Sequence, residues 1–275
     1  MRAGTRLFVL VITLFNSIYL AAEKKYIWAV VPQFTGTAVH RDWSPVLKHI
    51  ASKTGYSFEL KIYDSIPEFE KGFLKGEPDF AYMNPYHAVM AKEAQGYDPI
   101  IRNGKRLLSG IIVVRKDSVI HNVKQLEGEK LAFPSPNAFA ASLYMRALLR
   151  EKEQLQFTSI YSGTHSNSYR QVLIGNVKAA GAVNRTLLKE RNEVQRNLKI
   201  IYKTPGFPSH PLTVHKRVPD KVKSAVQLTL LEYGKTVVGK NRLKRILLAN
   251  PIKANYDIDY LPLKLLKLDK YLISY

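Results

Sequence analysis

The chain has 275 residues, no cysteine, and 42 Lys and Arg against 22 Asp and Glu, which gives a formal net charge of +20 at pH 7. This length allows one large or two medium domains with hydrophobic cores, and the missing cysteines exclude disulfides, thiolate metal sites, cysteine nucleophiles and a lipidated N-terminal cysteine. The positive charge favours anionic partners. Because the basic residues are scattered, concentrate only at 240–248 and form no nucleic-acid module, we expect no binding to DNA or RNA.

The N-terminus has the layout of a secretory signal peptide. Arg2 and Arg6 precede an uncharged apolar run at 7–20, and two alanines follow it. We therefore predict a signal peptide at residues 1–22 and a mature protein in the periplasm. Leu20 is bulkier than the small residue preferred three positions before a cut after Ala22, so an uncleaved membrane anchor is the alternative. No later stretch approaches the roughly 20 apolar residues that a membrane span needs.

From Tyr26 the chain alternates short apolar runs with helical patterns. Residues 26–31 predict a strand and 32–43 a loop. Residues 44–55 predict a helix with Ser44 as N-cap and Pro45 in the first turn. The alternation continues through a strand at 57–63, a helix at 66–76, a strand at 78–83 and a helix at 84–96. This order predicts an α/β fold with a mainly parallel sheet covered on both faces.

A second α/β unit follows a β-rich run at 109–118. Three strand-to-helix pairs make it up: 130–136 into a helix from Asn137, 157–163 into 164–176, and 178–184 into 185–193. Another β-rich run at 198–217 predicts a return crossing, and a long helical segment from Asp220 to about Ala249 closes the chain. Two such units joined by two crossings predict two lobes with a cleft between them.

Four predicted helix starts are candidates for the cleft. Ligands in open α/β sheets gather at the carboxyl ends of strands, where helix N-termini present unpaired N–H groups. The starts are the loop from Gln33 toward Ser44, then Asn84, Asn137 and residues 164–166. Each could instead be only a connection or a cap.

Two of these starts carry further polar side chains. Beside Asn84, Tyr86 and His87 could line a cleft. The stretch Gly163-Thr164-His165-Ser166 places several polar groups in one turn after an apolar strand and is the stronger ligand signal, although Thr164 or Ser166 could serve only as a cap.

Patterns that indicate catalysis are scarce. The sequence has no G-x-S-x-G, H-E-x-x-H, P-loop or G-x-G-x-x-G motif. Its seven histidines are dispersed, and neither His40 with Asp42 nor His210 with His215 has convincing metal-ligand spacing. We therefore expect no enzyme, no metal and no cofactor; turnover of a bound ligand that depended on His165 would reverse this expectation.

The order of these segments resembles the phosphonate/phosphate-type substrate-binding proteins of ABC transporters. The resemblance runs from about Tyr26 to Pro219 and is carried by DFAYMNPYHAVMAKEAQGYDPIIR (79–102), SGIIVVRKDSVIHNVKQLEGEKLAFPSPNAFAAS (109–142), YSGTHSNSYRQVLIGNVKAAGAVN (161–184) and TPGFPSHPLTV (204–214). It implies a type II periplasmic-binding fold: two α/β lobes, a two-strand hinge, and closure around a small ligand. We expect lobe 1 at 23–114 and 205–275, and lobe 2 at 115–204.

The resemblance also implies where the ligand binds. Carried over by position, it points to Gln33, Phe34, Tyr63, Asn84 and Tyr86 in lobe 1. In lobe 2 it points to Ser135, Asn137, Ala138, Phe139, Thr164, His165, Ser166 and Asn184.

Two departures from the family pattern affect the expected ligand. Where the family commonly has Ser-Thr-Ser-like hydroxyls, this chain has Ala138-Phe139-Ala140, and each lost hydroxyl could remove roughly 1.5–3 kcal/mol of hydrogen bonding to a charged oxygen. Backbone N–H groups survive there, Phe139 suits a smaller or more organic ligand, and Asn137 is left free to cap its own helix. Where the family commonly has an Asp, Asn184 removes a partner for a ligand ammonium.

We expect a monomeric periplasmic solute-binding protein that captures a small anionic ligand for an ABC permease. The ligand would be a phosphonate-like or phosphate-like oxyanion or an organic acid. The alternative is a ligand-sensing protein with a modified or degenerate pocket. Its partner would be a membrane histidine kinase, acting as a sensor kinase, or a cyclase.

Overall fold

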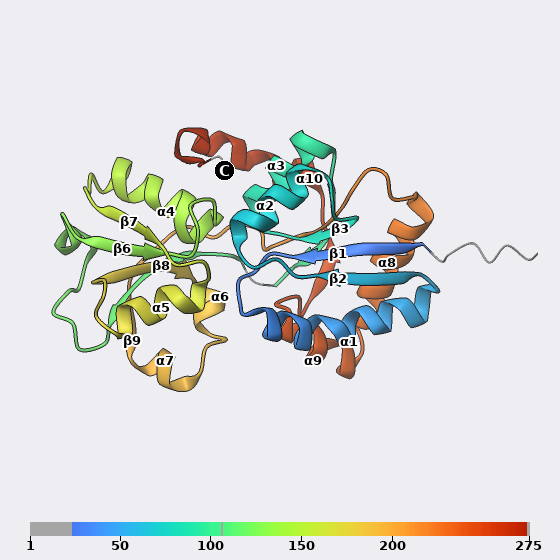
Figure 1. Ribbon diagram of the computed structural model, residues 1–275, viewed down its shortest axis with the longest axis horizontal. Helices are drawn as coiled ribbons and strands as arrows, with labels where there is room; N and C mark the ends of the chain where they lie inside the picture. The colour runs from blue at the N-terminus through green and yellow to red at the C-terminus, as the bar shows by residue number, and fades with distance from the viewer. Residues whose placement is uncertain (1–23, 106, 274–275) are drawn as a thin grey trace, which may run out of the picture.

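The computed structural model describes residues 24–105 and 107–273, and the predicted signal peptide lies outside them. Two α/β lobes lie side by side, each with its own sheet and with helices on both faces (Figure 1). The six-stranded sheet of lobe 1 has the order β11-β4-β10-β3-β1-β2, and the five-stranded sheet of lobe 2 has the order β7-β6-β8-β5-β9. The two predicted units are therefore present. No helix within the described ranges is long and apolar enough to cross a membrane.

Lobe 1 combines residues from both ends of the chain. β1 pairs in parallel with β2 and β3, whereas β10 returns from lobe 2 and pairs antiparallel with β3 and β4. The strands are β1 (Lys25–Val30), β2 (Ser57–Lys61), β3 (Phe80–Tyr82), β4 (Asp98–Asn103), β10 (Leu212–Val214) and β11 (Pro251–Lys253). The helices are α1 (Gly36–Thr54), α2 (Ile66–Leu74), α3 (Pro85–Gln95), α8 (Asp220–Tyr233), α9 (Val237–Arg245), α10 (Tyr256–Asp259), η4 (Leu261–Leu266) and η5 (Leu268–Tyr271).

Lobe 2 is built from the middle of the chain. β6 pairs in parallel with β7 and β8, and β5 pairs antiparallel with β8 and β9. Its strands are β5 (Gly110–Arg115), β6 (Lys130–Phe133), β7 (Thr158–Tyr161), β8 (Ala179–Val183) and β9 (Leu198–Lys203). Its helices are η1 (Val123–Leu126), the continuous run η2 (Phe139–Leu143), α4 (Tyr144–Ala147) and η3 (Leu148–Lys152), then α5 (His165–Leu173), α6 (Asn184–Leu187) and α7 (Asn192–Arg196).

Two chain crossings join the lobes. They lie antiparallel and pair at Leu108 and Phe207, whose N–H and C=O groups exchange hydrogen bonds of 2.8 and 2.9 Å. β5 lies wholly in the sheet of lobe 2. Sheet pairing therefore favours a lobe boundary before Gly110 rather than the expected one at 114.

The start of α1 differs from the prediction, which placed a loop at 32–43 and a cap at Ser44. The helix begins at Gly36, and the Thr35 hydroxyl accepts a hydrogen bond from the N–H of Ala38. Val39, Trp43 and Ile50 recur at helical spacing and are buried on one face. Their burial outweighs the backbone hydrogen bond that Pro45 cannot make inside the helix.

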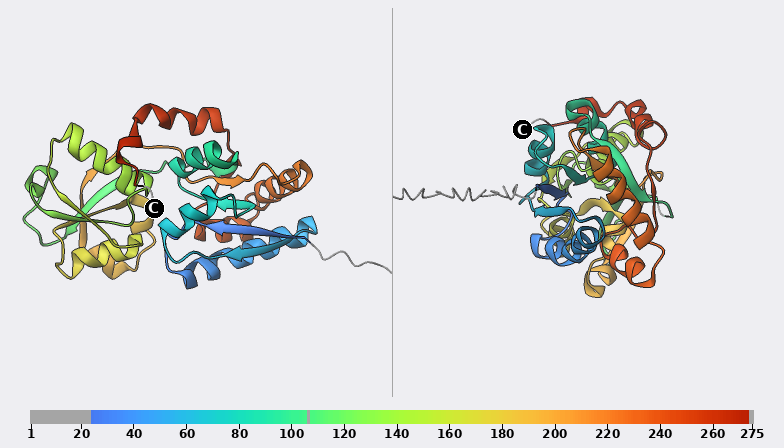
Figure 2. Two further views of the ribbon diagram at one scale, coloured as in Figure 1. Left: turned by 45° about the horizontal axis from the view of Figure 1, so that its top comes forward. Right: turned by 90° about the vertical axis from the view of Figure 1, so that its right-hand side faces the viewer.

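The predicted long helix from Asp220 to Ala249 is also wrong, because it divides into α8 and α9. At Gly234 an added Cβ would lie 2.3 Å from the Pro251 ring, so the chain passes β11 closely at this point. The Thr236 hydroxyl then accepts from the N–H of Gly239 and starts α9. After β11 the C-terminal segment, residues 256–273, runs from lobe 1 to the junction of the lobes (Figure 2).

Candidate ligand-binding site between the lobes

The helical run that begins at Phe139 opens toward the junction of the lobes without a side-chain cap. Ala138 precedes it in an extended conformation, and the N–H groups of residues 139–141 have no acceptor among the described residues. The sheet lies very close behind this turn: a Cβ at Gly110 would be 1.9 Å from the Ala140 carbonyl oxygen, and one at Gly181 would be 2.3 Å from that of Ala141. Glycines in β5 and β8 thus allow the first turn to rest on the sheet.

A small pocket lies at this helix start. It is lined from both lobes and from both crossings, by Val31, Gln33, Ile66, Asn84, Leu108, Ala138, Phe139, Ala140, Ala141, His165, Val183 and His210. The polar groups that face it are two amides, two imidazoles and the backbone of the helix start.

Both imidazoles in the pocket are buried and neutral. Burial lowers the pKa of His165 to about 3, and burial together with the nearby Arg185 charge lowers that of His210 well below its usual value. The Nδ1 atom of His165 has no hydrogen-bond partner in the described part of the chain, and the residue is only 2% exposed. A neutral imidazole carries one N–H, so each ring can offer one hydrogen bond to an anion without adding charge.

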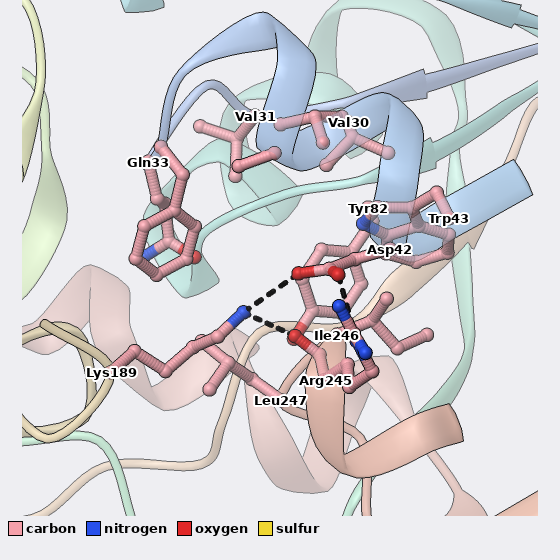
Figure 3. A pocket seen from close by; sticks show the side chains of 13 residues that line it. Val30, Val31, Gln33, Asp42, Trp43, Tyr82, Lys189, Arg245, Ile246 and Leu247 are labelled. Atoms are coloured by element: carbon pink, nitrogen blue, oxygen red, sulfur yellow. Dashed lines mark hydrogen bonds and ion pairs between the residues drawn. The ribbon is translucent and has the colours of Figure 1, made fainter. Parts of the chain in front are cut away.

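An interlobe charge cluster borders a second small pocket, which shares Val31 and Gln33 with the first. Figure 3 shows Lys189 of lobe 2 and Arg245 of lobe 1 directed at the buried Asp42 carboxylate, at 3.3 and 2.9 Å. Burial raises the pKa of Asp42, but Arg41, Arg245 and Lys189 outweigh it and hold that pKa at about 2. Lys189 also lies 4.5 Å from the centre of the Phe34 ring.

Asn137 connects the lobes directly, because its side-chain amide donates to Glu70 Oε2 at 2.8 Å. The other carboxylate oxygen of Glu70 lies 2.8 Å from His87 Nε2, and the Asn137 carbonyl accepts from Asn84 Nδ2 at 3.3 Å. Glu70 and His87 are almost completely buried. Both the side chain and the backbone carbonyl of Asn137, just before the helix start, are therefore bonded to the opposite lobe.

Asn137 does not cap its own helix, contrary to the prediction. Its Oδ1 accepts from the N–H of Ile273 at 3.0 Å, and its Nδ2 donates to the Ile273 carbonyl at 2.8 Å. The side-chain amide is thus bonded to Ile273 and Glu70, and no side-chain hydrogen bond caps the first helical turn.

The sequence-predicted residues only partly come together. Gln33, Asn84, Ala138, Phe139 and His165 line the first pocket, and Gln33 and Phe34 line the second. Behind the pocket wall the ring of Tyr86 stacks on Phe139 with 6.0 Å between centres.

The other predicted residues have different contacts. Thr164 caps α5 through the N–H of Asn167, as the cap alternative predicted. Ser166 donates to Glu190, and the Tyr63 hydroxyl donates to Glu77 at 3.0 Å. Ser135 is buried. Asn184 accepts the Ser109 N–H at 3.4 Å and borders a separate open groove beside the crossings.

Several lining residues escaped the sequence prediction. His210 reaches the pocket from the return crossing, and its spacing from His215 gave no sign of a site. Ile66 begins α2 and carries no chemical signal. Asp42, Lys189 and Arg245 are brought together by the fold from three distant helical regions. Within residues 24–105 and 107–273, no three His, Cys, Asp or Glu side chains are grouped to hold a metal ion.

The family model described as "ABC transporter, phosphonate, periplasmic substrate-binding protein" matches residues 28–260, well over half of the chain. The chain belongs to this family. Its members are periplasmic substrate-binding proteins of transport systems, which is the class that the sequence resemblance implied.

Individual relatives have low sequence identity to this chain but match most of its length. The chain is 23% identical over 265 residues to the phosphonates-binding periplasmic protein of Escherichia coli, covering 90% of this chain and 77% of that protein. The binding-protein component of an ABC phosphonate transporter from Pseudomonas aeruginosa has a TM-score of 0.81 at 17% identity, covering 89% of this chain and 86% of the other. PhnD1 from Prochlorococcus marinus, solved in complex with methylphosphonate, has a TM-score of 0.81 at 15% identity. The match covers 90% of this chain and 99% of PhnD1. These likenesses confirm the type II periplasmic-binding fold.

Proposed function

We propose that this family member binds a small phosphonate between its lobes, at the pocket beside the Phe139 helix start, and delivers it to an ABC permease. The observation that carries the proposal is the uncapped helix start at Phe139, which faces a pocket lined by both lobes. We further propose that it acts as a monomer in the periplasm. The relatives are phosphonate-binding transport proteins by name, and they lend no support to the sensing alternative.

The helix start can hold an oxyanion through its backbone alone. The N–H groups at 139–141, which have no acceptor in the described part of the chain, and the partial positive charge of the helix end both favour a negatively charged group. The His165 imidazole adds a donor from the next helix of lobe 2. These groups replace part of the hydrogen bonding that hydroxyls at 138–140 would have supplied.

Closure follows from ligand contacts to both lobes. Asn84 and Gln33 come from lobe 1, whereas His165 and the helix start come from lobe 2. A ligand that contacts both sets binds the closed arrangement better than the open one and therefore shifts the population toward it.

The binding test compares His165→Ala with His121→Ala by titration calorimetry with methylphosphonate. His165 lines the pocket, whereas His121 is exposed after β5. Loss of a hydrogen bond to a charged oxygen is worth roughly 1.5–3 kcal/mol, so His165→Ala should weaken binding about tenfold to a hundredfold. His121→Ala should leave the affinity unchanged, and equal effects would contradict the site.

A ligand screen by thermal shift tests the proposal more broadly. Ligand at 100 times its dissociation constant stabilises the folded state by about 2.7 kcal/mol, which moves the melting curve measurably. Phosphonates should stabilise the wild-type protein. If phosphonates, phosphate, phosphite, sulfonates and small carboxylates all leave the curve unmoved, the proposed function is wrong.

A further inference from the structure

Among the described residues that line the pocket, none is a partner for a positively charged ligand group. None of them is charged, and the polar ones are confined to two amides and two neutral imidazoles. The remaining lining residues are apolar, and apart from Phe139 they are aliphatic.

The acids just outside the pocket are already engaged. Glu70 is 1% exposed, and its two oxygens are taken by His87 and Asn137. Asp42, in the neighbouring pocket, is surrounded by three cationic side chains. Neither carboxylate is available to a ligand ammonium unless its own partners are released.

Phe139 forms an apolar wall of the pocket. The residue is 1% exposed, and its ring packs against Tyr86 of lobe 1 at 6.0 Å, Tyr144 at 6.1 Å and Phe207 of the return crossing at 5.0 Å between ring centres. Aromatic neighbours from three elements hold the ring in this position, so the wall offers a charged substituent an apolar surface without a hydrogen-bonding group.

We propose, building on the proposed function, that this pocket selects phosphonates with a small uncharged alkyl substituent and rejects those that carry an ammonium group. An alkyl group loses contact with water and gains contact with the apolar lining, which is favourable. An ammonium group in the same place loses its hydration and finds no carboxylate to replace it, which is costly.

The decisive comparison uses two ligands of equal length. Propylphosphonate and 2-aminoethylphosphonate differ only in a terminal methyl against a terminal ammonium group, so their comparison separates charge from size. With the full-length mature protein at pH 7.5, titration calorimetry should find propylphosphonate bound at least about tenfold more tightly. Methylphosphonate, the smallest of the three, serves as the reference for the pocket itself.

Val183 offers a matched pair of variants that tests the reason for the selectivity. It lines the pocket and is the N-cap residue of α6, without a side-chain cap bond, in the extended conformation that Asp and Asn both adopt at N-caps. Val183→Asp should add the missing carboxylate and reduce the preference for propylphosphonate about tenfold or more. Val183→Asn has the same shape without the charge and should keep the preference.

The outcomes separate the two proposals. If methylphosphonate binds but 2-aminoethylphosphonate binds as tightly as propylphosphonate or more tightly, the selectivity is wrong and the proposed function stands. If Val183→Asn changes the preference as much as Val183→Asp, the missing carboxylate is not its cause. If none of the three phosphonates binds the wild-type protein, the proposed function fails and the selectivity fails with it.

Discussion

His165 shows how burial sets the chemistry of a single residue in this site. Its position as the first residue of α5 places the ring under the helix start of lobe 2, where water is excluded. A charged imidazole there would lose its hydration, so the folded protein keeps the ring neutral. The ring can therefore donate a hydrogen bond at any pH in the ordinary periplasmic range without changing its charge.

The depressed pKa of His165 makes stability depend on pH. It falls from 6.5 to about 3 on folding, so between these values the unfolded chain binds a proton that the folded chain does not. Its contribution to stability is complete above pH 6.5 and is lost as the pH falls toward 3. We expect the difference in unfolding free energy between His165→Gln and wild type to move in favour of the variant by roughly 1–3 kcal/mol from pH 7 to pH 4.

Urea unfolding at several pH values measures this change. His121→Gln, at an exposed position, is the control and should follow the wild-type pH dependence. A constant difference between His165→Gln and wild type across this range would show that the folded state does not keep the ring neutral.

At the scale of elements, the C-terminal segment links the lobes. Its Asp269 carboxylate accepts a hydrogen bond of 2.9 Å from the hydroxyl of Tyr86 on α3. Its Tyr271 hydroxyl donates a hydrogen bond of 3.0 Å to the carboxylate of Glu151 on η3. Arg146, on α4, donates to the carbonyls of Pro136 and Tyr271, both at 2.9 Å. The segment therefore joins the outer side of lobe 1 to the helix whose N-terminus faces the pocket.

These contacts should differ in strength according to burial. Arg146 is 6% exposed, so Arg146→Met leaves two carbonyl groups without a donor and should cost about 2–3 kcal/mol of unfolding free energy. Glu151 is half-exposed, and Glu151→Gln should cost less than about 1 kcal/mol. Scanning calorimetry compares the two variants, and an equal or larger loss for Glu151→Gln would contradict the role of Arg146.

The start of α1 marks the limit of prediction at this scale. Thr35 and Ser44 are both acceptable caps, and Pro45 is typical of a first turn, so local chemistry favoured the later start. The helix begins earlier because Val39 and Trp43 have a buried face of lobe 1 to pack on. The helix starts predicted at Asn84 and at 164 are confirmed, with Asn84 and Thr164 as the caps.

At the scale of the whole molecule, side chains of the two lobes contact each other across the junction. One hydrophobic cluster includes Met83 and Tyr86 of lobe 1 and Phe139 and Leu143 of lobe 2. Lys189 adds an ion pair to Asp42 across the junction. The balance between open and closed arrangements therefore depends on these contacts as well as on the ligand.

Lys189→Met should shift this balance toward the open arrangement. The variant loses the interlobe ion pair, and two cations, Arg41 and Arg245, still neutralise Asp42. Small-angle X-ray scattering should find a larger radius of gyration than for wild type without ligand, and saturating methylphosphonate should abolish the difference. Lys178→Met, at an exposed position of lobe 2, is the control. Identical scattering of Lys189→Met and wild type without ligand would contradict a role of this pair in closure.

The amino-acid sequence was sufficient for the α/β alternation, the two lobes and the family, because caps, helical periodicity and strand patterns act between residues a few positions apart. It also showed that residues 138–140 lack the hydroxyls that are common at these positions in the family. It could not predict that Asn137 bonds to Glu70, that Lys189 meets Asp42, or that His210 enters the pocket. These contacts join residues far apart in the chain, and they exist because two separately formed sheets bring their strand ends face to face. The set of side chains that lines the pocket depends on that meeting of lobes, which no local pattern records.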